Sequence, residues 1–525
     1  MCNVTHLFRW ETKNYRIKHR KTAVPQHVLF IFQEGKGMKK KLLSALLVGA
    51  LAASVLTGCA DAVSDAAAGD TAAANDAAAA DDTVAADDAA AENTDAAGEA
   101  STDTATAVTT VGDPNGTHME VWSFVEAHNT FYAKMVDKWN QENPDKTIEI
   151  TFTTYPYADM HQKLLMSLSA GEGAPDICDV EMGQVPNIYE GLDTWLYPLD
   201  DAMKPYAADM LQSRLDAYKG SDGKQYGAPF HVGATVMYYN MKALEDAGIT
   251  RDEVDAVVTW DDWAALGEKY LNAIGNPDGK YWTSVDTGGT DWQWIAMAEY
   301  GEDWTGGYDG KANVQLESVK NMLTQEQEWV NSGLAEVSPD GHVDLEAGYQ
   351  NILDHNIVSF PKAMWYMSRF TNYMPEEKGN WYIAKCPVFK EGQNCSVGIG
   401  GTGTVVTQQA ADKALAADFL CYAKMSPEGE EMIWKDLGFD VCNTSLWTDD
   451  AFAHDDSNQY NQFFRNYPYD VLAEIKDQIG TVMTVPISTT INEYANNTTL
   501  NEILEDGMDV DEALQELQDA VDAEQ

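Results

Sequence analysis

The chain has 525 residues, which is room for about two or three domains and an ample core. Its formal net charge of -50 and isoelectric point near 4.3 exclude a nucleic-acid partner, because such binders place Lys and Arg on the face that contacts phosphate. A charge of this sign keeps a secreted protein soluble and away from anionic surfaces.

The first 58 residues have the features of an export signal that begins late. Residues 1–37 are a mixed polar stretch that does not fit such a signal, so we predict that Met38 is the true start. Lys39-Lys-Lys41 precedes about sixteen apolar or small residues, too few for an ordinary membrane span. Leu56-Thr57-Gly58-Cys59 then resembles the bacterial lipobox. We expect a signal peptide over 38–58 and a diacylated Cys59 that anchors the protein to the outer face of the bacterial cell membrane.

The segment after Cys59 differs in composition from the rest of the chain. Residues 60–112 are almost wholly small or acidic and include no Lys, Arg or aromatic residue. Such a segment has no apolar face for packing to stabilise. We therefore predict a disordered tether over 59–117, which would let a globular body move above the membrane.

Five cysteines lie beyond this tether, at Cys178, Cys386, Cys395, Cys421 and Cys442. Their spacing contains no paired C-x-x-C pattern, so we predict no metal site and no cofactor. Two of them, at 386 and 395, flank a turn and could form a disulfide across a hairpin, and buried free thiols are the alternative.

The globular body begins with a β-α-β-α-β pattern. The expected elements are a strand at 119–125, a helix at 130–140, a strand at 148–153, a helix at 160–170 and a strand at 176–180. This order predicts a doubly wound α/β sheet with ligand contacts at the carboxyl ends of its strands.

Residues 226–240 form the stretch around which the rest of the chain is organised. Pro229 and Gly233 interrupt regular structure, and an apolar, β-branched run follows at 234–239. We expect this segment to leave one sheet and to enter another. His231 and Thr235 within it could contact a ligand, and a buried strand with a hydrogen-bonded histidine is the alternative.

A second α/β pattern follows, with further crossing strands predicted at 356–365 and 398–407. Two lobes joined by several crossings imply a cleft that closes by a hinge motion. Gly398-Ile-Gly-Gly-Thr-Gly403 matches the dinucleotide fingerprint, but a β-branched run follows it where that fingerprint requires a helix. We therefore interpret these glycines as positions where the backbone approaches a ligand or the other lobe closely.

Tryptophans at expected strand ends and loops provide the best chemical indication. Aromatic rings stack on the C–H faces of sugars, and nearby carboxylates, amides and Arg hydrogen-bond the hydroxyls. Most Trp residues only pack, so the clustering beside polar residues is what favours a carbohydrate ligand.

A family resemblance rests on several stretches of the globular body, which are His128-Asn-Thr-Phe-Tyr132, Tyr155-Pro-Tyr157 with Met160-His161, Ala170-Gly-Glu-Gly-Ala-Pro-Asp-Ile177, His231-Val-Gly-Ala-Thr-Val-Met-Tyr-Tyr-Asn240, Thr259-Trp-Asp-Asp262, Trp365-Tyr-Met-Ser-Arg369 with Tyr373-Met-Pro375, residues 398–406, Leu437-Gly-Phe-Asp440 and Glu512-Ala-Leu-Gln515. Through these stretches, residues 119–523 resemble family 1 of the extracellular solute-binding proteins of bacterial ABC importers, and within it the arabino-oligosaccharide-binding lipoproteins. The resemblance implies a two-lobed fold of the periplasmic-binding-protein type II class.

By this resemblance the N-lobe comprises 118–233 and 358–407, and the C-lobe comprises 234–357 and 408–525. The expected function is capture of a carbohydrate, delivered to the permease subunits of an ABC importer by a lipid-anchored monomer. The expected ligand-binding residues are Trp122, His128, Tyr157, Glu181, His231, Thr235, Trp292, Trp294, Trp365, Tyr366, Arg369, Gly400 and Thr402.

Two other functions are compatible with the sequence. A sensor lipoprotein that signals through a membrane kinase would bind a ligand similarly and differ only in its partner. An anchored glycoside hydrolase would need two carboxylates facing each other across the bond, and Glu126, Asp179 and Glu181 are the candidates. The sequence places no two of these as a facing pair, so we expect no enzyme activity.

Overall fold

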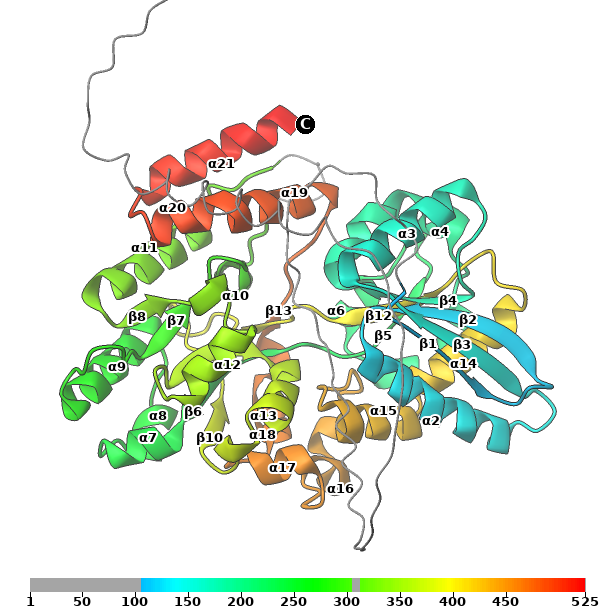
Figure 1. Ribbon diagram of the computed structural model, residues 1–525, viewed down its shortest axis with the longest axis horizontal. Helices are drawn as coiled ribbons and strands as arrows, with labels where there is room; N and C mark the ends of the chain where they lie inside the picture. The colour runs from blue at the N-terminus through cyan, green and yellow to red at the C-terminus, as the bar shows by residue number, and fades with distance from the viewer. Residues whose placement is uncertain (1–104, 305–311, 525) are drawn as a thin grey trace, which may run out of the picture. The chain divides into compact units, whose positions relative to one another are not determined.

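The structure is a computed structural model that describes residues 105–304 and 312–524. A six-stranded sheet with the order β1-β3-β2-β4-β12-β5 forms the centre of the N-lobe (Figure 1). Strands β2, β3 and β4 are parallel, whereas β1 is antiparallel to β3, and β12 is antiparallel to both β4 and β5. The strands are β1 (Ala107–Gly112), β2 (Thr117–Ser123), β3 (Ile148–Thr154), β4 (Ile177–Glu181), β5 (Gly227–Pro229) and β12 (Thr402–Val406).

The side chains of this sheet pack into two cores, one on each face. Burial alternates along β3, whose Ile148, Ile150 and Phe152 enter the core beneath α2 and α14. Cys178 and Val180 of the fully buried β4 enter the opposite core beneath α3. The helices of this lobe are α2 (Glu126–Glu142), α3 (Tyr157–Ala170), α4 (Leu192–Trp195), α5 (Asp200–Met203), α6 (Gln212–Asp216), α14 (Lys413–Met425) and α15 (Pro427–Met432), with 3₁₀ segments η2 (Met182–Gly191) and η3 (Ala207–Asp209) and the π-helical η7 (Ile433–Leu437).

The C-lobe is built on a smaller antiparallel sheet with the order β10-β6-β9, together with two parallel strand pairs, β7-β8 and β11-β13. Its strands are β6 (Thr235–Asn240), β7 (Thr283–Val285), β8 (Ala335–Val337), β9 (Ser359–Ala363), β10 (Trp381–Ala384), β11 (Ser396–Val397) and β13 (Ile479–Gly480).

Helices make up most of the C-lobe, and α9 (Trp260–Ile274) shows why they form where they do. The Thr259 hydroxyl accepts the amide of Asp262, whose carboxylate accepts the Thr259 amide, so a reciprocal cap starts α9 at Trp260. Gly275 ends the helix in the left-handed conformation. The C-lobe helices are α7 (Met241–Asp246), α8 (Arg251–Asp255), α9 (Trp260–Ile274), α10 (Asp291–Tyr300), α11 (Glu317–Ser332), α12 (Glu346–Leu353), α13 (Met367–Tyr373), α16 (Asp450–Ala453), α17 (Gln459–Phe463), α18 (Pro468–Ile475), α19 (Pro486–Tyr494), α20 (Leu500–Leu504) and α21 (Val510–Glu524), with the short segments η4 (Pro339–Gly341), η5 (Met364–Tyr366), η6 (Pro375–Glu377), η8 (Leu446–Thr448), η9 (Lys476–Gln478) and the π-helical η10 (Ala495–Thr499).

The predicted crossing at 226–240 is confirmed, because β5 belongs to the N-lobe sheet and β6 to the C-lobe sheet. The segment between β11 and β12 crosses beside it, and the Ile399 amide donates to the Gly233 carbonyl at 2.9 Å. Gly233 has a φ of 66°, and a Cβ there would lie 2.6 Å from the Ile399 carbonyl oxygen, so this close pairing requires glycine. The rejection of a dinucleotide site is consistent with the structure, because strand β12 follows the glycines.

Strand pairing differs from the predicted lobe boundaries in two places. The range 358–407 is predicted to belong to the N-lobe, but β9 and β10 pair with β6 in the C-lobe sheet. The range 408–525 is predicted to belong to the C-lobe, but α14 packs on α2, β5 and β12 of the N-lobe. An apolar run indicates that a strand is buried and does not indicate which sheet buries it.

The predicted tether also ends earlier than expected. Ala107–Gly112 forms β1, which pairs along its whole length with β3, and Val111 packs against the core. The β-branched residues of this run favour an edge strand more than they favour disorder. The rest of the tether up to residue 104, the signal peptide and Cys59 lie outside the described residues.

The five cysteines of the body are all buried free thiols, so Cys386 and Cys395 are not bonded to each other. Within 105–304 and 312–524, no helix has the length and apolar content needed to cross a membrane.

Candidate functional site

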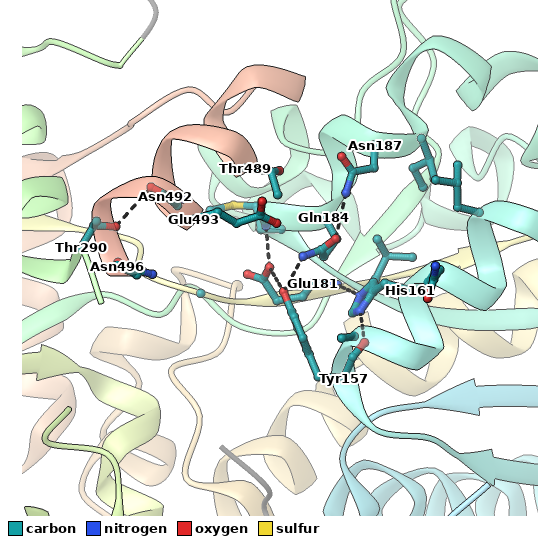
Figure 2. Close-up of a pocket in the computed structure, with 18 of the residues that line it drawn as sticks. Tyr157, His161, Glu181, Gln184, Asn187, Thr290, Thr489, Asn492, Glu493 and Asn496 are labelled. Carbon is teal, nitrogen blue, oxygen red and sulfur yellow. Dashed lines mark hydrogen bonds between the residues drawn. The ribbon is translucent and has the colours of Figure 1, made fainter. Parts of the chain in front are cut away.

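A pocket of about 610 Å³, which we call the polar pocket, is lined by residues of both lobes (Figure 2). The N-lobe wall comes from α3, the end of β4 and η2. The C-lobe wall comes from α10 and from the continuous helix of α19 and η10, while the crossing segment contributes Ile399 and Gly400. The polar side chains that line it are Tyr157, His161, Gln162, Glu181, Gln184, Asn187, Thr290, Asp291, Thr489, Asn492, Glu493 and Asn496.

Glu181 is the centre of the N-lobe wall because it is the last residue of β4 and its side chain caps η2. Its Oε2 accepts hydrogen bonds from the Tyr157 hydroxyl at 3.0 Å and from the Gly183 amide at 2.7 Å. The Gln184 amide donates to the same tyrosine hydroxyl at 3.1 Å. Burial raises the pKa of Glu181, against the lowering effect of these donors. Glu181 therefore presents an oriented, buried carboxylate to the pocket.

His161 fixes the position of this wall. Its Nδ1 lies 2.7 Å from the carbonyl of Tyr157, and its Nε2 accepts the backbone amide of Glu181 at 3.1 Å. The ring therefore donates at one nitrogen and accepts at the other, which is the neutral tautomer. Burial lowers the pKa of His161 to about 4, so the imidazole is uncharged at neutral pH.

The C-lobe wall presents hydrogen-bonding groups that are not used within the protein. The Thr290 hydroxyl donates to Oδ1 of Asn492 at 3.3 Å. The hydroxyl oxygen of Thr489 and Oδ1 of Asn496 are buried and have no hydrogen-bond partner within the described part of the chain. Because an unsatisfied buried polar atom costs about 1–3 kcal/mol, two of them facing one pocket indicate contacts with a polar ligand. Asn496 lies in the π-helical η10, a local helix form that is frequent at functional sites.

Asp291 is a third carboxylate in the lining, beside Glu181 and Glu493, and a buried lysine balances its charge. The ammonium of Lys362 lies 2.6 Å from Asp291 and 3.5 Å from Asp286. Burial acts to lower the pKa of Lys362, but the carboxylates of Asp291 and Asp286 together outweigh it and raise that pKa above its ordinary value. Among the described lining residues there is no Lys or Arg, so the pocket offers acceptors and neutral donors to a ligand.

The structure brings together four of the thirteen predicted ligand-binding residues, which are Tyr157, Glu181, Trp294 and Gly400. Trp294 lies on α10 with 8% of its surface exposed, and the left-handed Gly400 belongs to the crossing segment. His161 belongs to one of the stretches that carry the family resemblance, and it positions the backbone of Tyr157 and Glu181.

The other nine predicted residues do not line the polar pocket. In the N-lobe, Trp122 packs edge-on against Tyr155 at 5.3 Å, and His128 bonds Asp179 through Nδ1 at 3.0 Å inside the core. Thr402 is buried in β12, in register with Glu181.

Two of the nine lie in the crossing segments instead. His231 is buried 3.6 Å from Asp440, and the Thr235 hydroxyl donates to the carbonyl of Val397 at 2.7 Å. Thr235 therefore links the two crossing segments, as the alternative of a buried strand expects. Nδ1 of His231 is buried without a hydrogen-bond partner among the described residues, so the hydrogen-bonded histidine of that alternative is not observed.

The remaining four lie in the C-lobe. Trp292 is enclosed by other indoles, and the Tyr366 hydroxyl donates to the Val343 carbonyl at 3.1 Å. Trp365 is half-buried and donates to the Ile399 carbonyl, and the Arg369 guanidinium lies over its ring while pairing with Asp344 at 3.0 Å.

The carboxylates named for a hydrolase are also separated by the fold. Asp179 is fully buried and accepts from Tyr132 and Thr404, in contact with the buried Lys424, so it does not reach the polar pocket. Only Glu181 of the three candidates lines it.

Sequence reasoning missed the whole contribution of α19 and η10. The spacing of Thr489, Asn492 and Asn496, at intervals of three and four residues, places them on one helix face. That polar stripe was the available signal, and an exposed helix surface would produce the same pattern.

Two α/β lobes joined by crossing strands, with a polar pocket lined from both, define a two-lobed ligand-binding protein of the type II class. A family model described as "Bacterial extracellular solute-binding protein" matches residues 122–424. The chain therefore belongs to the bacterial extracellular solute-binding proteins.

Curated relatives agree with this assignment. The chain is 32% identical over 426 residues to the arabinooligosaccharide-binding protein of Halalkalibacterium halodurans, covering 80% of this chain and 92% of the relative. It is 34% identical over 375 residues to the protein of the same name from Bacillus subtilis, covering 71% and 84%. These relatives are named as binding proteins and not as enzymes.

Solved structures show the same fold. The binding protein of B. animalis subsp. lactis Bl-04, in complex with beta-1,6-galactobiose, superposes with a TM-score of 0.62 at 19% identity, covering 78% of this chain and 97% of that one. The sugar-binding protein MalE of Xanthomonas citri gives 0.63 at 18% identity, with 78% and 97% covered.

Proposed function

We propose that this protein is a receptor that captures a neutral, arabinose-containing oligosaccharide in the polar pocket and delivers it to the permease of an ABC importer. The observation that supports this best is the chemistry of the pocket wall. Carboxylates, amides and hydroxyls face the pocket without Lys or Arg among the described lining residues, and Trp294 offers an apolar ring. Such a set accepts and donates hydrogen bonds to sugar hydroxyls and disfavours an anionic ligand.

The size of the pocket is compatible with an oligosaccharide. A volume of about 610 Å³ lies within the range of roughly 300–1,000 Å³ that small-molecule sites occupy, and a ligand of several rings would fill it. The names of the two curated relatives direct the choice toward arabinose-containing chains.

The test is a calorimetric titration of the protein with arabino-, xylo-, malto- and galacto-oligosaccharides beside their monosaccharides, with each mixture checked afterwards for cleavage. We expect the arabino series to bind most tightly and to remain intact. Equal affinity for all series would contradict the ligand assignment. Cleavage products would show that the protein is a hydrolase and would contradict the proposed receptor function.

The proposal includes a lipid anchor on Cys59, based on Leu56-Thr57-Gly58-Cys59 and the preceding apolar stretch. Cells expressing the wild type should incorporate an alkyne-tagged fatty acid into this protein, and Cys59→Ala should lose the label. Cys2→Ala is the matched control, because cleavage after Gly58 would remove that residue. Persistent labelling of Cys59→Ala would refute the anchor.

A further inference from the structure

A second pocket, which we call the arginine pocket, has a volume of about 740 Å³ and shares with the polar pocket one described lining residue, Met182. Segments η2 and α6 of the N-lobe form one wall, and β13 with the residues after it forms the other. The crossing segment adds Val397 and Gly398. Apolar side chains at positions 185, 186, 217, 397, 479, 482 and 483 line part of it, beside polar side chains at positions 212, 213, 481 and 484.

Arg214 of α6 is the buried charged side chain in the lining of this pocket, whereas Asp216 and Lys219 are exposed. Only 5% of its surface is exposed, and one terminal nitrogen, Nη1, lies 2.7 Å from the Met182 sulfur and 3.4 Å from the Gly400 carbonyl. The other terminal nitrogen, Nη2, is buried and has no hydrogen-bond partner among the residues described. A guanidinium has five N–H groups in a planar fork, and here most of that fork is not used within the protein.

The guanidinium is also not neutralised by a carboxylate. Within the described parts of the chain, Arg214 forms no ion pair of 4 Å or less, although the nearby Cys442, Asp440 and Glu181 act to raise its pKa. Burial has the larger effect and lowers the pKa, because desolvation disfavours the charged form. At the edge of the pocket, Asp216 and Lys219 lie 3.9 Å apart and balance each other. One uncompensated positive charge therefore remains.

The backbone around this arginine is shaped to admit it. A Cβ at Gly398 would lie 1.3 Å from Nη2 of Arg214, so glycine at this position lets the guanidinium lie directly against the crossing segment. The sequence predicted that the backbone at the glycines of 398–403 closely approaches a ligand or the other lobe. At Gly398 the group that it approaches is the guanidinium of Arg214, in the N-lobe. Keeping an unpaired charge this close to the hinge is unfavourable unless a ligand offsets the cost.

We propose that the arginine pocket is a second ligand site, which takes a small carboxylate with an apolar body. The carboxylate would pair with Arg214 as a bidentate acceptor, and the body would lie against the apolar walls. The site is independent of the oligosaccharide and opposite to it in charge preference. Its volume is within the range of ordinary small-molecule sites.

The probe is 4-butylbenzoate, compared with its neutral isostere 4-butylbenzamide, titrated calorimetrically into the full chain. We expect the benzoate to bind at least about tenfold more tightly than the amide, since a charge-assisted bidentate pair forms only with the anion. Arg214→Met should reduce benzoate affinity to that of the amide, whereas Arg214→Lys should retain part of the preference.

A second variant keeps the test valid if Arg214→Met does not fold. Ala217→Trp fills the pocket from its half-buried wall without removing the charge, and it should also abolish benzoate binding. Arg251→Met is the matched control, because it removes one arginine that is 55% exposed on the C-lobe surface. Equal binding of benzoate and benzamide to the wild type, no binding of the benzoate at millimolar concentration, or unchanged benzoate binding by Ala217→Trp would overturn the proposal.

Discussion

The polar pocket and the arginine pocket have similar volumes and share the side chain of Met182, but their linings differ in charge. Glu181, Asp291 and Glu493 line the first, with amides and hydroxyls between them. Arg214 and Lys219, balanced only by Asp216, line the second among apolar side chains. Both are enclosed by residues of the N-lobe, the C-lobe and the crossing segments.

The difference shows how one protein can offer two chemically exclusive sites within a short distance. A neutral polyol gains hydrogen bonds from carboxylates, amides and hydroxyls in the polar pocket, and in the arginine pocket it leaves the charge of Arg214 unpaired. A carboxylate meets like charges in the first and an unpaired guanidinium in the second. Each of the following changes tests one side of this contrast.

The largest effect is expected from Glu181→Ala. The change removes a charged acceptor that Tyr157 and the Gly183 amide orient, and hydrogen bonds to charged groups contribute about 1.5–3 kcal/mol. Affinity for the neutral oligosaccharide should fall about a hundredfold, measured by calorimetry, while benzoate binding persists. An unchanged oligosaccharide affinity in a folded variant would remove Glu181 from the binding site.

The next effect is a pH dependence caused by His161. Its pKa is lowered in the folded state to about 4, from the ordinary 6.5, so the unfolded state binds more protons between these values. Stability from this residue is therefore fully present above pH 6.5 and is lost as pH falls toward 4, by about 2 kcal/mol at pH 5.

Urea denaturation of the wild type and of His161→Gln at pH 7 and pH 5 measures this loss. The amide of Gln can replace both hydrogen bonds without titrating, so the variant should lose less stability over the interval. Identical losses in the two proteins would exclude His161 as the cause.

A smaller effect, about tenfold, is expected from Glu493→Lys, which places a cation on the exposed edge of the polar pocket. Discrimination against oligosaccharides that contain a uronic acid should weaken, because a like-charge contact becomes an opposite-charge contact. The ratio of the affinities for a neutral and a uronate-bearing chain measures this. Glu505→Lys, at an exposed position directly after α20 and outside the lining, should leave the ratio unchanged.

The smallest effect is expected from Thr489→Val, about fivefold in oligosaccharide affinity, since a neutral hydrogen bond contributes about 1 kcal/mol. The free protein should become slightly more stable, because a buried hydroxyl without a partner is removed. Thr498→Val, on the exposed side of η10, is the control for both measurements. A Thr489→Val variant that binds as the wild type does would show that the hydroxyl faces no ligand group.

Local sequence pattern determined much of this protein. The alternating and apolar runs predicted strands at 148–153 and 234–239, which are observed as β3 and β6, and Thr259-Trp-Asp-Asp262 contains the residues that cap the start of α9. The glycine-rich run before β12 was recognised as a crossing and not as a nucleotide site, because β-branched residues follow it. Each of these features depends on neighbours within a few residues, so it can be read along the chain.

Only the tertiary structure decided which lobe each strand joined and which side chains met in the pockets. Strands β9 and β12 are both short and fully buried, yet they join different sheets. Trp292 and Trp294 are two residues apart on α10, and one is enclosed by indoles while the other lines a pocket. No local sequence pattern around Arg214 indicated that this residue lines a pocket. Burial depends on partners more than a hundred residues away, such as Gly398 and Asn492, and a local pattern does not encode that pairing.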